Sequence, residues 1–224
     1  MKINFSYVLV LSFTWMLTAS TCDKDCNDSV GTYKFVIPVS ISPTTDTIRI
    51  GDTLTIVSVF ENEVLDRTSM KTYLLDSFLF FPVTNLFKID SLETSIAPLD
   101  LFDYFIDENK FDYSIASFSD GSKSLTGSNY AYDGNTYSLV FKLIPRQIGT
   151  FFLQHGCSID LIDQNFPGYC ERNGMKAVTL LNENDGNNLY LLEDSPDPHF
   201  SEWILAKPKQ RFYDLGGYAF VVVE

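Results

Sequence analysis

The fold of this chain is decided by the stretch TIRIGDTLTIVSVF at residues 47–60. Polar and apolar residues alternate in it on both sides of Gly51 and Asp52, a pair that predicts a turn. A period of two gives a strand one buried face and one exposed face. The stretch therefore predicts two half-buried strands, at 47–50 and 53–60, joined by a tight turn.

Strand-like runs of β-branched and aromatic residues recur along the chain, bounded by Gly, Pro, Asn and Asp. They lie at 34–42, 78–81, 137–144, 149–153 and 218–223. Helical patterns are short and are found at 96–106, 188–193 and 200–205. Many half-buried strands must cover one another's apolar faces. The sequence thus predicts an all-β fold, an antiparallel β-sandwich with one or two short helices.

The N-terminus has the three parts of an export signal. Lys2 supplies a positive end, residues 7–17 form an apolar core, and small residues lead into Cys22. The apolar core is shorter than the roughly 20 residues that a membrane-spanning helix needs. We therefore expect a cleaved signal at 1–21, a polar tether at 22–31 and a single domain at 32–224.

The end of this signal resembles the lipobox of bacterial lipoproteins, in which a cysteine becomes the first mature residue and carries acyl chains. That pattern prefers Leu and a small residue where this chain has Ala19 and Thr21. A looser version is common in the Bacteroidota, and residues 23–25 resemble the acidic stretch of their surface lipoproteins. The resemblance implies a lipid anchor on Cys22 and a place on the bacterial outer membrane. The alternative is cleavage after Ser20, which gives a secreted or periplasmic protein.

The four cysteines bear on the same question. An exported chain meets an oxidising compartment, in which disulfides form. Acylation of Cys22 leaves three thiols, whereas without it Cys22 can pair with Cys26 and Cys157 with Cys170. We expect the bond between Cys157 and Cys170 in both cases. It would close a loop containing residues 167–168 and contribute about 3 kcal/mol.

Charge and composition exclude several function classes. The formal net charge is -13, and a field of that sign repels nucleic acid. The acidic turns at 133–135 and 182–186 are typical of hairpins and lack the spacing of a calcium-binding EF-hand loop. The two histidines, His155 and His199, are too few for a three-histidine metal site. We expect no metal and no cofactor.

Two arrangements of residues are candidates for catalysis. His155 and Cys157 lie two apart on one strand, where a base could activate a thiolate, or where the cysteine instead forms a disulfide. A pair of carboxylates could hydrolyse a glycoside, but no spacing selects a pair among 29 acidic residues. The sequence thus favours a non-catalytic binding or scaffolding module, with a glycan-active protein or glycoside hydrolase as the alternative.

Tyrosines cluster at 128–137, beside amide and carboxylate groups. Such a loop can hold a sugar, the ring on its apolar face and the polar groups on its hydroxyls. Tyr130, Tyr132 and Tyr137 are therefore the candidate contacts for a glycan or protein ligand. The other interpretation is that these rings cap the sandwich or lie on the surface of a hairpin.

Two further stretches carry a resemblance. Residues 42–54 resemble the first hairpin of bacterial immunoglobulin-like surface domains, and with the turn at 143–151 the chain resembles surface lipoproteins of the Bacteroidota. The resemblance implies an immunoglobulin-like β-sandwich at the cell surface and no particular activity. The tryptophan that immunoglobulin domains place between two cysteines is absent, since Trp203 follows both Cys157 and Cys170.

Overall fold

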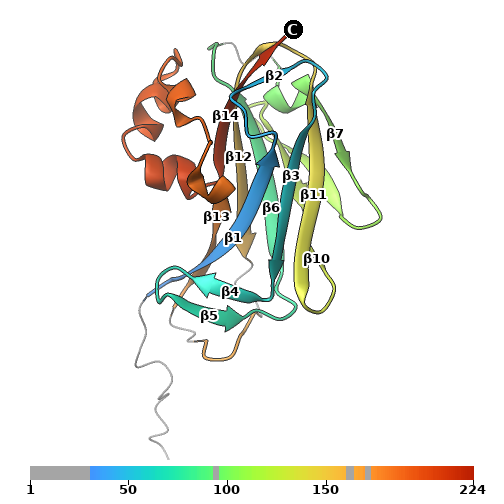
Figure 1. Cartoon of the computed structure of the whole chain (residues 1–224), viewed down its shortest axis with the longest axis vertical. Helices are drawn as coiled ribbons and strands as arrows, with labels where there is room; N and C mark the ends of the chain where they lie inside the picture. Colours follow the sequence, from blue (N-terminus) through green and yellow to red (C-terminus); the bar gives the residue numbers. More distant parts are fainter. Residues whose placement is uncertain (1–30, 93–95, 160–163, 170–172) are drawn as a thin grey trace, which may run out of the picture.

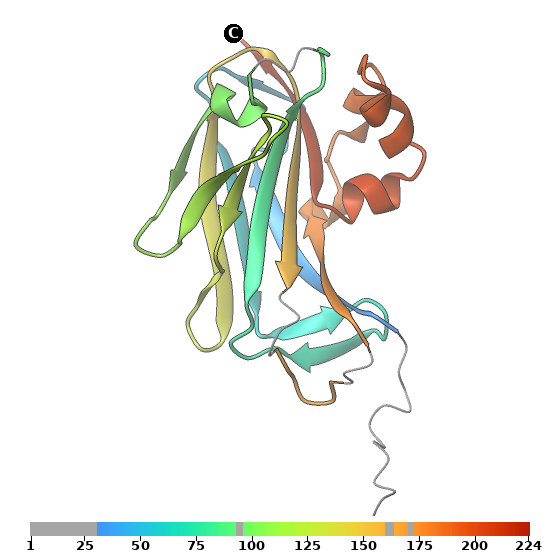
Figure 2. The ribbon, with the colours of Figure 1, turned by 180° about the vertical axis from the view of Figure 1, so that it is seen from behind.

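The computed structural model describes residues 31–92, 96–159, 164–169 and 173–224. Its strands form two facing layers, and short helical segments lie on one side of them (Figures 1 and 2). The predicted all-β sandwich is confirmed. The predictions for Cys22, Cys26 and Cys170, and for the signal segment at 1–21, fall outside the described residues.

The larger sheet has the strand order β10-β11-β3-β1-β4-β5, with β13 also paired to β1 and β7 to β11. Its strands are β1 (Tyr33–Ser42), β3 (Leu54–Glu61), β4 (Glu63–Asp66), β5 (Lys71–Leu74), β7 (Phe102–Ile106), β10 (Ala131–Tyr132), β11 (Thr136–Pro145) and β13 (Met175–Leu181). The smaller sheet has the order β2-β14-β12-β6-β9-β8. Its strands are β2 (Thr47–Arg49), β6 (Phe80–Lys88), β8 (Tyr113–Ser117), β9 (Lys123–Gly127), β12 (Gly149–Ile159) and β14 (Gly217–Val223).

The stretch at 47–60 forms two strands as predicted, but they belong to different sheets. β2 pairs with β14 and β3 pairs with β1 and β11, so the turn between them crosses from one layer to the other. Two pairings also depart from the predicted antiparallel arrangement. β1 runs parallel to β13, and β2 runs parallel to β14, because residues far apart in the sequence supply those partners.

The core between the sheets is built from the buried halves of the alternating strands. β1 contributes Phe35, Ile37, Val39 and Ile41, and the neighbouring strands add similar side chains. Several rings meet edge to face, as in the Phe102–Phe151 pair with centroids 5.0 Å apart. Such contacts add to the apolar burial that holds the two layers together.

A second apolar cluster covers the outer face of the smaller sheet. Outward side chains of β6, β12 and β14, including Phe152, pack against the C-terminal helical segment. This segment consists of η4 (Leu189–Leu192), η5 (His199–Ile204) and η6 (Lys209–Tyr213). Phe152 and Phe212 stack with their centroids 5.5 Å apart. β12 and β14 are therefore buried on both faces, and this face is called the covered face below.

The helical predictions are confirmed in part. The patterns at 188–193 and 200–205 correspond to η4 and η5. The prediction at 96–106 is wrong over its second half, because η2 (Pro98–Leu101) ends after one turn and β7 follows. The short η3 (Asn182–Asn184) lies directly after β13. The strands that lie outside every predicted strand are β4, β5, β7, β8, β9, β10 and β13.

Candidate functional site

The outer face of the larger sheet exposes apolar side chains on three adjacent strands. Val59 on β3, Val140 on β11 and Phe105 on β7 are 52%, 39% and 57% exposed. The strand register brings them together. Val59 is two residues from Val57, which lies opposite Val140, and Lys142, two residues from Val140, lies opposite Phe105. We call this surface the free face. Contiguous apolar patches on the surface of a folded domain are typical of interaction sites.

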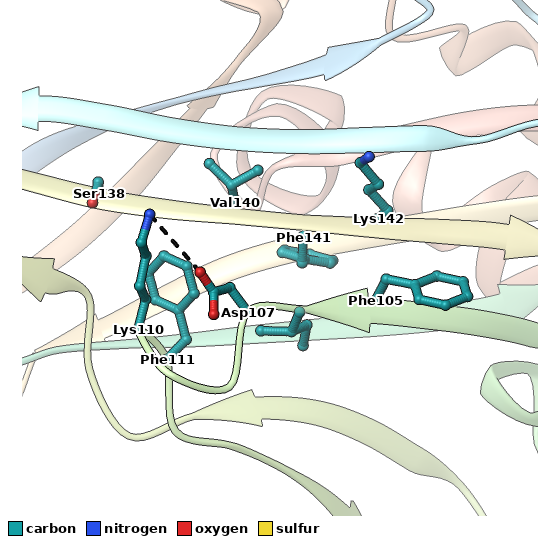
Figure 3. A pocket seen from close by; sticks show the side chains of 9 residues that line it. Phe105, Asp107, Lys110, Phe111, Ser138, Val140, Phe141 and Lys142 are labelled. Atoms are coloured by element: carbon teal, nitrogen blue, oxygen red, sulfur yellow. Dashed lines mark ion pairs between the residues drawn. The ribbon is translucent and has the colours of Figure 1, made fainter.

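A groove of about 490 Å³ opens in the free face beside β7. Its lining residues are Phe105, Ile106, Asp107, Lys110, Phe111, Ser138, Val140, Phe141 and Lys142. Figure 3 shows the β11 side chains along one side of this groove and the residues that follow β7 along the other. Phe111 and Phe141 are buried, so they form an apolar floor beneath the exposed side chains.

The turn after β7 builds one wall of the groove. The backbone N–H groups of Lys110 and Phe111 donate to the carbonyl oxygen of Asp107 at 2.9 and 3.0 Å. This turn places Lys110 beside Asp107, with Nζ and Oδ2 3.8 Å apart (Figure 3). The pair is exposed and so adds little stability, but it gives the groove a charged rim. An apolar floor with a charged rim is the usual anatomy of a protein-binding surface.

The groove does not have the groups for the predicted alternative, glycoside hydrolysis. Asp107 is the single carboxylate among its lining residues, and hydrolysis of that kind needs two that face each other. Within the described part of the chain, no group of three or more His, Cys, Asp or Glu side chains is placed to hold a metal ion. The chemistry that the groove offers is contact with apolar and charged groups.

The structure corrects the role predicted for Tyr130 and Tyr137. Both rings are buried in the core, Tyr137 completely, so a ligand on the surface does not reach them. The Tyr137 hydroxyl donates to the carbonyl oxygen of Leu75 at 2.7 Å and accepts the N–H of Phe78 at 2.6 Å. These bonds hold the segment between β5 and β6 against the core. The second interpretation of the tyrosine cluster, capping of the sandwich, describes both residues.

Tyr132 differs from the other two because it is partly exposed. Its ring stacks on Tyr137 with the centroids 4.4 Å apart. Its hydroxyl donates to Asp76 Oδ1 at 2.6 Å and accepts from Asn62 Nδ2 at 3.1 Å. The hydrogen bond to Asp76 raises the pKa of the Tyr132 hydroxyl. One ring beside an amide and a carboxylate thus remains of the predicted sugar site.

The His155 and Cys157 pair lies on β12, with His155 inside the sandwich and Cys157 only partly buried. His155 is fully buried, and its Nδ1 lies 2.8 Å from Thr84 Oγ1. Burial lowers the pKa of His155 to about 4 and raises the pKa of the Cys157 thiol. A thiol that stays protonated is a poor nucleophile. Cys157 is a free thiol here, and because Cys170 lies outside the described residues, the bond between them stays a prediction.

Trp203 is the one exposed tryptophan in the part of the chain that the structure describes, and its ring contacts two neighbouring side chains. His199 stacks on it with the centroids 4.8 Å apart. The Arg211 guanidinium lies 3.9 Å from the ring centroid. These contacts join η5 to η6 by stacking and by a cation–π interaction. They leave the ring poorly placed to stack on a sugar.

The sequence analysis missed the residues that form the free face. Their signal was present, because Val59 and Val140 occupy positions in alternating strands where a solvent-facing side chain is expected to be polar. Phe105 was hidden by the wrong helical prediction over 96–106.

None of the helical segments in the described ranges has the length and the apolar content that a membrane-spanning helix needs.

No protein-family model and no curated protein sequence matches the chain. Solved structures similar to it include the N-terminal domain of a Streptococcus gordonii adhesin, with a TM-score of 0.29 and 10% identity, covering 55% of this chain and 29% of that one. A type II cohesin domain from the Acetivibrio cellulolyticus cellulosome has a TM-score of 0.29 and 6% identity, covering 65% and 92%. The human F-spondin reeler domain has a TM-score of 0.29 and 14% identity, covering 65% and 90%. At these scores neither a partner nor an activity of this chain follows from the likeness.

Proposed function

We propose that this chain is a non-catalytic binding module that presents the free face of its larger sheet to a protein partner. The observation that carries the proposal is the row of Val59, Val140 and Phe105, exposed across three strands beside a groove with an apolar floor. Exposed apolar side chains on a folded domain lose contact with water only when a partner covers them.

The shape of the free face favours a protein over a small molecule. The groove is open along the sheet, and its apolar residues continue onto β3 beyond the groove. Small-molecule sites enclose most of the ligand surface, whereas protein partners meet broad surfaces with an apolar centre and a charged rim. Lys110, Asp107 and Lys142 supply that rim.

We further propose that the module is held at the surface of a bacterial outer membrane by acyl chains on Cys22. The proposal rests on the apolar segment that ends at this cysteine and on the acidic residues at 23–25. Residues 1–21 are then removed, residues 22–31 act as a tether, and residues 32–224 form the domain. Mass spectrometry of the native N-terminus tests this directly. An unmodified N-terminus at Thr21 would contradict it.

Site-specific photo-cross-linking in intact cells tests the binding face. A photo-reactive phenylalanine analogue replaces Val140 in one variant and Ile148 in the matched control. Ile148 is also exposed and apolar but lies in the turn between β11 and β12. We expect a discrete protein adduct from position 140 and none from position 148. Equal adducts from both positions, or none from either, would overturn the proposal.

Carbohydrate binding at Tyr132 is a second candidate, favoured by the hydrogen bonds that join its hydroxyl to Asn62 and Asp76. A glycan-array screen separates the two candidates. If Tyr132→Ala abolishes a glycan signal that Phe105→Ala leaves intact, the tyrosine is the contact. Turnover of a glycan by the purified chain would instead identify a hydrolase.

A further inference from the structure

The β4–β5 hairpin lies at the end of the sandwich where β1 begins, opposite the end that holds the C-terminus (Figure 1). Hydrogen bonds join the hairpin to the start of β1. The Thr68 hydroxyl donates to the carbonyl oxygen of Thr32 at 3.0 Å, and the Arg67 N–H donates to that of Lys34 at 2.9 Å. The hairpin is thus fixed beside the point where the tether enters the domain.

This hairpin carries exposed apolar side chains on one face. In the register of β4 and β5, Leu65 lies opposite Thr72 and Leu74 lies opposite Glu63, so both leucines are on the same side. Both are exposed, and Met70 in the connecting turn is 71% exposed.

The turn that presents Met70 is held in one conformation. The buried Asp66 carboxylate accepts the N–H groups of Lys34, Thr68 and Ser69. Burial raises the pKa of Asp66, but these hydrogen bonds outweigh burial, and the pKa is lowered overall. Met70 has a φ of 57°, a backbone conformation that side chains other than glycine rarely adopt. The fold thus keeps an apolar side chain in solvent at a backbone cost.

A second groove of about 530 Å³ continues this apolar surface onto β1, β13 and η6. Its apolar lining consists of Val36, Leu65, Met70, Leu180 and Tyr213, and its polar lining of Arg67, Asn184, Lys209 and Asp214. Arg67 Nη1 lies 2.6 Å from Asp214 Oδ1.

Cations gather beside this groove although the chain as a whole is acidic. Lys34 and Lys176 are neighbours in the β1–β13 register, at the same end of the two strands as the hairpin. Lys209 lines the groove itself, together with Arg67, whose charge is paired with that of Asp214. Apolar side chains flanked by lysine and arginine are what a protein surface needs to rest on a bilayer, with the apolar groups at the acyl boundary and the cations at phosphates.

We propose that the hairpin end of the domain rests on the lipid surface of the membrane that holds the anchor. This proposal depends on the lipid anchor at Cys22 proposed above. Thr32 is ten residues from Cys22, so the hairpin end is tethered within roughly 35 Å of the acyl chains. Tethering raises the effective concentration of a weak contact. The free face stays available to its partner because it is formed by other strands.

Tryptophan fluorescence on lipid vesicles tests this contact. The mature chain from residue 23 carries an N-terminal polyhistidine tag and is tethered to phosphatidylethanolamine–phosphatidylglycerol vesicles that contain nickel-chelating and brominated lipids. We expect the emission of Met70→Trp to shift to the blue and to be quenched by bromine. Leu74→Trp is the second probe, in case the turn does not tolerate the first. The chain without an added tryptophan supplies the Trp203 background.

Ile148→Trp is the matched control, because Ile148 is also apolar and 50% exposed but lies away from the hairpin. Its emission should not change. Lys34→Glu with Lys176→Glu should reduce the quenching of Met70→Trp. Quenching of Ile148→Trp equal to that of the hairpin probes would overturn the proposal. So would the absence of quenching in both Met70→Trp and Leu74→Trp, which would leave a protein as the occupant of this groove. The tag replaces the acyl chains, so this outcome is separate from a failure of lipidation at Cys22.

Discussion

The two outer faces of the sandwich are treated in opposite ways. On the covered face, Phe152 of β12 and Ala219 of β14 lie beneath Phe200, Ile204 and Phe212 of the helical segment. On the free face, side chains of similar character stay in contact with solvent. Burial of the first set stabilises the fold by about 25 cal/mol for each Å² removed from water. The second set contributes little to folding, so its apolar character points to a contact outside the chain.

The difference between the two faces is visible in the amino-acid sequences of their strands. β14 has no polar side chain from Ala219 to Val223, because both of its faces are packed as far as Val222. β3 and β11 alternate, and their outward positions carry Thr55, Lys142 and Ser138 as well as the exposed valines. The covered face is therefore formed by strands with continuous apolar sequences. The free face is formed by alternating strands, in which some outward positions are apolar instead of polar.

The largest effect that we predict is on the covered side, at Gly216. A Cβ atom at this position would lie 2.1 Å from the carbonyl oxygen of His155, and its φ is 66°. Gly216→Ala should therefore reduce the free energy of unfolding by more than about 4 kcal/mol, measured by denaturant titration. Gly186→Ala is the matched control, since Gly186 has a φ of 63° and its nearest such contact is at 3.8 Å. It should cost only about 1 kcal/mol.

Removing the ring that joins the helical segment to the sheet is the next test. Phe212 is fully buried and stacks on Phe152, so Phe212→Ala should cost about 3 to 4 kcal/mol through lost contacts and a cavity. Phe105→Ala removes the same ring from the free face. It should change stability by no more than about 0.5 kcal/mol. An equal loss of stability in the two variants would contradict the claim that only the covered face contributes to folding.

Acid should reduce the free energy of unfolding through His155, which lies in β12 beneath the covered face. The pKa of His155 is lowered to about 4 in the folded chain, whereas unfolded histidine has its ordinary pKa of 6.5. The unfolded state therefore binds the extra proton, and stability is lost as pH falls from 6.5 to 4. The loss amounts to about 3 kcal/mol. Denaturant titrations at several pH values should show this slope in the wild type, and His155→Gln should lack it.

The smallest effect belongs to the free face. Phe105→Ser combined with Val140→Thr replaces exposed apolar groups by polar ones. We expect the free energy of unfolding to stay within about 1 kcal/mol of the wild type, because both side chains lie on the exposed face of the sheet and outside the two apolar clusters. A loss comparable to that of Phe212→Ala would show that the free face is packed in solution.

Runs of β-branched and aromatic residues, alternating in β3 and β11 and continuous in β14, were enough to predict the sandwich and the strands at β1, β3, β11 and β14. They did not reveal the strand order, since β13 reaches β1 from far along the chain. The tyrosine site failed for a related reason. Tyr130 and Tyr137 look like surface residues among Asn, Asp and Gly, but the backbone groups of Leu75 and Phe78 satisfy the Tyr137 hydroxyl in the core. Only the fold reveals which polar partners reach a ring.

The account depends most on the claim that the free face binds a partner and does not serve folding. The direct measurement is photo-cross-linking in intact cells from position 59, which lies in this face beside Val140. We predict a protein adduct in the otherwise wild-type chain and its loss in the Phe105→Ser/Val140→Thr background, with the amount of folded protein unchanged. An adduct of equal yield in both backgrounds would contradict the claim.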